Sequence, residues 1–141
     1  MLKLFVALAV VISCIASSSA GAVGSLRPPV IHETFTPLPC PAHPTTTQGA
    51  IGCAEERILA TDHEIDAQAM AAFALLLPKD RVVFVQGEVA WLRYRRASCL
   101  AEASKYFGGS VYGLYYAQCV ENRNEAHLRD LAELLRVLRF H

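Results

Sequence analysis

Two cysteines placed symmetrically about a pair of glycines restrict the fold of this chain more than any other feature. Cys99 and Cys119 each lie ten residues from Gly109, and helix-forming residues run into and out of Gly108-Gly109. Glycine adopts positive φ without strain and commonly ends a helix. The spacing therefore predicts an antiparallel helix hairpin, over residues 88–119, in which the two cysteines face each other.

The first 20 residues are typical of a secretory signal peptide. Lys3 gives the positive start, residues 4–12 form an apolar run, and Ser-Ser-Ala at 18–20 is a small-residue cleavage site. The apolar run is too short to span a bilayer permanently. Residues 11–14, Val-Ile-Ser-Cys, also resemble the lipobox of bacterial lipoproteins, in which Cys14 would be lipidated. The chain is therefore expected to be exported, either secreted or periplasmic, with membrane attachment only through Cys14.

The cysteine count agrees with export. Beyond Cys14 the chain has four cysteines, which in a small exported domain predict two disulfides. Three pairings exist; symmetry about the glycines favours Cys99–Cys119, which leaves Cys40–Cys53. No CxxC or HxxxH spacing is present, so we expect neither a metal site nor a cofactor. The 13 basic and 13 acidic residues balance and form no basic stripe, which argues against nucleic acid as a partner.

Proline separates the leader from a helical domain. Six of the seven prolines lie between residues 28 and 44, where they exclude regular helix. We therefore predict an extended, partly mobile linker or arm over residues 21–39 and a domain over residues 40–141.

Three helices are expected in this domain, over residues 53–77, 81–105 and 111–138. In the first and third helices, residues at three-to-four spacing predict the buried faces, among them Ile58, Ile65, Val120 and Asn124. Pro78 is expected to stop the first, and Asp80 and Ser110 are candidate N-caps of the second and third. Residues 82–85, Val-Val-Phe-Val, also suit a strand, but the helical pattern continues for several turns beyond them, which favours helix. The expected fold is an all-α, disulfide-bonded bundle of about three helices with an extended Pro-rich N-terminal arm.

Charged residues on the core-facing side of the second helix need an explanation. Glu88, Trp91 and Arg95 are in phase there, and Asp62 on the first helix could join them, with Arg123 or His127 from the third. One interpretation is a structural polar network that orients the helices, because buried charges are normally paired. The alternative is a catalytic Glu88 with a raised pKa. No second catalytic carboxylate, nucleophile elbow or phosphate loop accompanies it, so we expect a protein that is not an enzyme.

The turn between the second and third helices is rich in aromatic residues. Residues 106–116 contain four tyrosines and one phenylalanine around Gly108-Gly109. These rings either cap the end of the bundle or form a protein-binding surface, since tyrosine-rich, glycine-containing tips suit recognition. The candidate partner-binding residues are Lys105, Ser110, Tyr112 and Tyr116.

Several residues form one pattern along the chain: the four cysteines, Asp62, the Gly-Gly-Ser at 108–110, and the run at residues 88–99, Glu-Val-Ala-Trp-Leu-Arg-Tyr-Arg-Arg-Ala-Ser-Cys. In this pattern the chain resembles the LprI-like lysozyme-inhibitor family of exported bacterial proteins. The family usually has Gln where this chain has Glu88 and Asp where it has Arg96. In the late helix the family usually has Thr and Arg where this chain has Asn124 and His127. A compensating rearrangement of the charge network, with Arg96 preserving one pair, is therefore a hypothesis.

The resemblance implies an all-α, disulfide-bonded, exported protein that binds another protein. Its expected partner is a lysozyme-like muramidase, which it would block sterically, with Lys105, Ser110 and Tyr112 entering the substrate cleft. The alternative hypothesis is an envelope interaction or adaptor module with another partner and no action on lysozyme.

Overall fold

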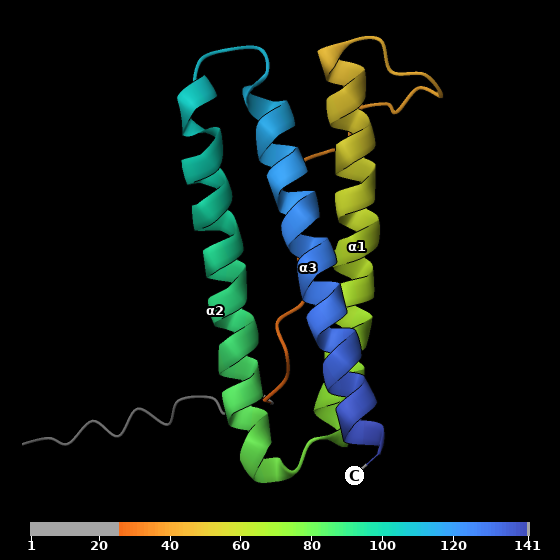
Figure 1. Cartoon of the computed structure of the whole chain (residues 1–141), viewed down its shortest axis with the longest axis vertical. Coiled ribbons are helices and arrows are strands. Elements are labelled where there is room, and N and C mark those ends of the chain that lie inside the picture. Colours follow the sequence, from red (N-terminus) through yellow and green to blue (C-terminus); the bar gives the residue numbers. More distant parts are fainter. Residues whose placement is uncertain (1–25, 141) are drawn as a thin grey trace, which may run out of the picture.

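The computed structural model describes residues 26–140 as three long helices and one extended segment (Figure 1). The helices are α1 (Thr47–Leu75), α2 (Pro78–Ala103) and α3 (Tyr112–Arg139), and a short 3-10 helix, η1 (Ser104–Tyr106), follows α2. No strand occurs between residues 26 and 140, so the predicted all-α bundle is confirmed. The predicted signal peptide and Cys14 lie outside the described residues.

Helix α3 packs against both other helices and carries the core. The predicted stripes on α1 and α3 are buried at three-to-four-residue spacing, with Ile58 and Ile65 on α1 facing Val120 and Leu131 on α3. Small side chains between them, such as Ala54, allow the helix axes to approach closely. None of the described helices has a stretch long and apolar enough to span a bilayer.

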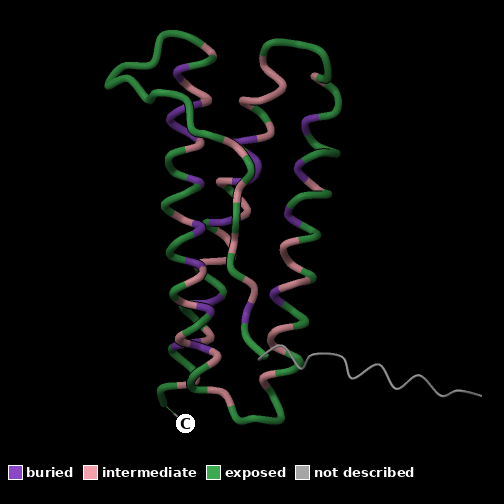
Figure 2. Tube along the Cα trace, turned by 180° about the vertical axis from the view of Figure 1, so that it is seen from behind, coloured by how far each residue is buried: buried purple, intermediate pink, exposed green. Residues whose placement is uncertain are grey.

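The proline-rich arm is a structural layer of the bundle. It is extended, as predicted, and runs between α1 and α2 (Figure 2). The backbone N–H of Ile31 donates to Asp66 Oδ1 on α1 over 3.1 Å, and that of Leu38 donates to Glu55 over 2.8 Å. Phe35 packs against the core cluster of α1 and α3. The arm thus occupies the position that a fourth helix has in a four-helix bundle.

Both predicted disulfides are present. Cys99–Cys119 joins α2 to α3 with a Cα–Cα distance of 5.4 Å, and Cys40–Cys53 joins the end of the arm to α1 with a distance of 4.4 Å. A bridge closing a loop of either length contributes about 3 kcal/mol in the chain-entropy account. Such bridges fit an oxidising compartment outside the cytoplasm.

The first helix begins six residues earlier than predicted. The Thr46 side chain caps it by accepting from the N–H of Gly49 over 3.1 Å. Gly52 in the first turns of this helix is required by the arm, which crosses the helix beside it. A Cβ on Gly52 would lie 2.5 Å from the carbonyl oxygen of Pro39, so only glycine lets the arm cross the helix here.

The N-caps predicted for the second and third helices, Asp80 and Ser110, were wrong. Pro78 begins α2 rather than simply ending α1, because a proline in the first turn loses no hydrogen bond. Asp80 lies inside that first turn and is not the N-cap. Ser110 precedes Val111, which is the N-cap of α3 and makes no side-chain capping bond. Residues 82–85 are helical, as predicted.

Candidate functional site

A buried polar network joins the arm to all three helices. Nη1 of Arg95 lies 2.6 Å from Asp62 Oδ1 on α1 and 2.8 Å from Asn124 Oδ1 on α3. Its Nη2 lies 2.6 Å from Glu33 Oε1 on the arm. Asn124 also donates to Asp62 Oδ1 over 2.8 Å and to Thr61 over 2.9 Å. One guanidinium therefore binds two carboxylates from different parts of the chain and fixes how the arm and helices meet.

The four predicted network residues fall into two connected groups. The Arg95 guanidinium carbon lies 5.4 Å from the centroid of the Trp91 ring. The His127 ring stacks on Trp91, with the two ring centroids 3.8 Å apart. His127 Nε2 lies 3.0 Å from Glu88 Oε2. Glu88 and His127 are two of the positions at which this chain departs from the family pattern, and they pair with each other.

The predicted role of Arg96 in that compensation was wrong. Arg96 is exposed, and none of the ion pairs among the described residues includes it. Arg123 lies 3.9 Å from Glu102 and over the Tyr94 ring, outside the network. Glu33 and Asn124 also belong to the network, although neither was predicted as a member of it. Asn124 stood on the predicted core face, where a polar side chain signals a partner, whereas nothing local marked Glu33.

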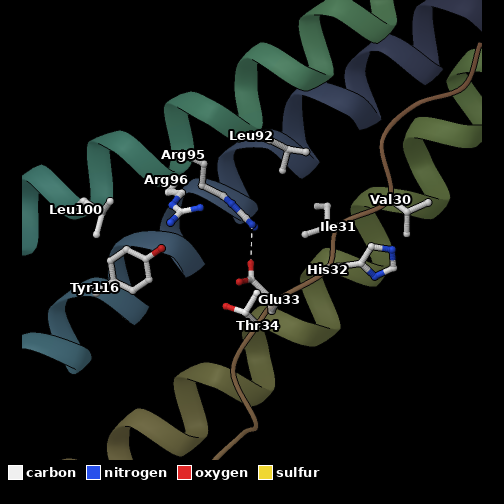
Figure 3. A pocket seen from close by; sticks show the side chains of 10 residues that line it. All are labelled: Val30, Ile31, His32, Glu33, Thr34, Leu92, Arg95, Arg96, Leu100 and Tyr116. Carbon is white, nitrogen blue, oxygen red and sulfur yellow. Dashed lines mark hydrogen bonds and ion pairs between the residues drawn. The ribbon is translucent and has the colours of Figure 1, made fainter. Parts of the chain in front are cut away.

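A cavity of about 480 Å³ opens beside this network, between the arm and α2 (Figure 3). Glu33, Arg95, Arg96 and Tyr116 point into it from the arm, α2 and α3. Burial raises the pKa of Glu33, although Arg95 opposes this effect, and burial also raises the pKa of Tyr116. Glu88 does not line this cavity, and its carboxylate is hydrogen-bonded to His127. Within residues 26–140 no three His, Cys, Asp or Glu side chains are grouped to hold a metal.

A second candidate site is the tight aromatic turn between α2 and α3, which we call the tip and define as residues 104–115. Successive turn bonds close it: the N–H of Phe107 donates to Ser104 over 3.0 Å and that of Gly109 to Tyr106 over 2.9 Å. Gly108 has φ 78°, the left-handed region, and makes the reversal possible. The Cys99–Cys119 disulfide clamps the two helices behind the tip, so the loop is held at both ends.

Stacked rings give the tip its shape. Tyr106 and Tyr115 stack with centroids 3.8 Å apart, and the Lys105 ammonium lies 5.0 Å from the Tyr106 ring. The Tyr115 hydroxyl lowers the pKa of Tyr106, and Lys105 acts in the same direction. Phe107 meets the Tyr112 ring edge-on at 5.7 Å, yet 82% of Phe107 is exposed.

The four candidate binding residues do not all meet at this tip. Lys105, Ser110 and Tyr112 lie on it, with Lys105 and Ser110 exposed. Tyr116 lies one turn further along α3, where it packs against the core and lines the cavity beside Glu33. Phe107, the most exposed large hydrophobic side chain of the described residues, was not singled out.

Comparison with known families identifies the family of the chain. A family model described as lysozyme inhibitor LprI matches residues 40–131, about two thirds of the chain. The chain belongs to the LprI family. The matched residues contain both disulfides, Arg95 and the whole tip, whereas Glu33 on the arm lies before them. No curated protein and no solved structure matches the chain.

Proposed function

We propose that this LprI-family chain is an exported protein that binds a lysozyme-like muramidase and blocks its substrate cleft with the tip. The observation that carries this proposal is Phe107, which is 82% exposed on a disulfide-clamped, ring-stacked turn. An exposed aromatic side chain on a rigid turn loses little conformational entropy on binding, which favours tight association. The family name supplies the class of partner.

The chemistry of the tip suits such a cleft. Lysozyme-type glycoside hydrolysis depends on a pair of carboxyl groups, and the Lys105 ammonium gives the tip a cation to place near them. Phe107 and Tyr112 present ring faces and edges of the kind that fill an extended sugar-binding groove. With a formal net charge of zero the chain gains little long-range steering, so the inhibition should depend only weakly on salt.

The experiment is a cell-wall turbidity assay with the purified, oxidised chain and several lysozyme types. We expect inhibition, and we expect Phe107→Ser to cost about 2 kcal/mol of binding, which is a roughly thirtyfold higher concentration for the same inhibition. Phe140→Ser is the matched control, because Phe140 is 80% exposed but lies at the end of α3.

Three results would count against the proposal. Absence of inhibition at micromolar excess over every lysozyme type would dispose of muramidase as the partner. Equal inhibition by both serine variants would move the contact away from the tip. Capture of a different envelope protein that depends on Phe107, with no lysozyme inhibited, would favour the adaptor hypothesis.

A further inference from the structure

The end of the bundle opposite the tip carries a second exposed apolar surface. The α1–α2 connection and the C-terminal end of α3 lie together at this end (Figure 1). Of the 15 large hydrophobic side chains exposed among the described residues, seven belong to segments at this end, which we call the base: Leu26, Leu75, Leu77, Val82, Val83, Val137 and Phe140. Leu77 is 60% and Val83 70% exposed. Such clustering marks an interaction site.

The same segments concentrate positive charge. The acidic residues in these segments are Asp80 and Glu133, whereas five residues there are basic, although the whole chain has no net charge. The five basic residues are Arg27, Lys79, Arg81, Arg136 and Arg139. Two of the five have local partners. Arg81 donates to the carbonyl oxygen of Leu76 over 3.0 Å, and Arg136 pairs with Glu133. Arg27, Lys79 and Arg139 remain available around the apolar side chains.

The arm begins at this end of the bundle. The described chain begins at Leu26, beside the start of α2 (Figures 1 and 2). Cys14, the candidate lipidation site, precedes Leu26 by 12 residues, a reach of at most about 40 Å. Helix α3, with 28 residues, separates the base from the tip by about 40 Å. A tether through residue 14 would thus allow the base to touch a membrane while the tip points away.

We infer that the base binds the surface of an anionic phospholipid bilayer. Leu77, Val83 and Phe140 would enter the boundary between headgroups and acyl chains, and the surrounding cations would face the lipid phosphates. A second copy of the chain fits this surface less well. In a symmetric dimer the same positively charged patch would face itself, and like charges oppose that contact. The inference does not depend on lysozyme being the partner of the tip.

The test is co-sedimentation of the exported, processed chain with vesicles. Cys14→Ser is introduced and the mass checked, so that no acyl chain contributes. We expect binding to vesicles that contain about one third phosphatidylglycerol, weaker binding at high salt, and little binding to phosphatidylcholine alone. Arg139→Glu, which changes the local charge by two, should weaken binding at least fivefold, and Val83→Glu should weaken it more than tenfold.

In the vesicle assay Phe140→Ser is the test variant and Phe107→Ser is its matched control. Phe140→Ser should reduce vesicle binding, whereas Phe107→Ser should leave vesicle binding unchanged. Circular dichroism melting of each variant separates loss of binding from loss of fold. No sedimentation with anionic vesicles would overturn the inference, as would equal binding by Val83→Glu. A concentration-dependent dimer that Val83→Glu dissociates, without vesicle binding, would assign the base to self-association instead.

Discussion

Removal of the Arg95 guanidinium should destabilise the fold more than any other single change in the polar network. The side chains of Arg95 and Asp62 are 9% and 5% exposed, and Glu33, the third member, is 19% exposed. Arg95→Met keeps most of the volume but leaves two carboxylates without their cation. Breaking a buried pair in this way costs about 3–5 kcal/mol. For a domain of this size that is a fall in melting temperature of about 12–20 °C.

Urea unfolding followed by far-UV circular dichroism measures this loss, with the disulfides kept oxidised. Adding Asp62→Asn and Glu33→Gln to Arg95→Met should recover more than half of it, because the uncompensated charges are then removed. The difference in unfolding free energy between wild type and Arg95→Met should also shrink as the pH falls, since protonation then neutralises Glu33 in the folded variant. A loss below about 1 kcal/mol, the size of a surface ion pair, would refute the assignment of Arg95 as the central cation.

Three further predictions concern single contacts. Burial raises the pKa of Glu33, so the folded state holds this proton more tightly than the unfolded state. The unfolding free energy of wild type relative to Glu33→Gln should therefore fall as the pH rises from about 4.5 towards neutrality. A difference in melting temperature that stays constant across this pH range would contradict the prediction. Gly108→Ala should cost about 1 kcal/mol through its positive φ, whereas Gly87→Ala, in mid-helix with open space around it, should stabilise by about 0.5–1 kcal/mol; equal denaturation midpoints would argue against the turn geometry. A double-mutant cycle of Glu88→Gln and His127→Ala should give a coupling energy of at least 0.5 kcal/mol, and additive effects would show that the two residues do not interact.

The helix hairpin and both disulfides could be predicted because local signals determine them. The glycines at 108 and 109 indicate where the chain reverses direction. Cys99 and Cys119 are equidistant from this turn, so the hairpin brings them together as a pair. Periodicity likewise identified the buried face of α3, including the polar position 124. These features depend on residues close together in the sequence, so a pattern along the chain is sufficient to find them.

The arm and the start of α1 could not be predicted in the same way. Proline excludes helix, but it does not reveal that Glu33 and Phe35 bind side chains far along the chain. Glycine has low helix propensity, and only the arm crossing at Pro39 explains the presence of Gly52 inside a helix. Tyr116 was assigned to the tip because it follows Tyr112 closely, yet one helical turn carries it to the cavity. In each case a long-range contact outweighs the local signal.

We propose that the tip is the surface that contacts a lysozyme. Amide hydrogen exchange of the oxidised chain, measured alone and with an excess of an inhibited lysozyme, tests it most directly. We predict that new protection is confined to residues 104–115, and that the base and the cavity beside Glu33 exchange as in the free protein. Protection centred on the base or the cavity, with the tip unchanged, would contradict this proposal.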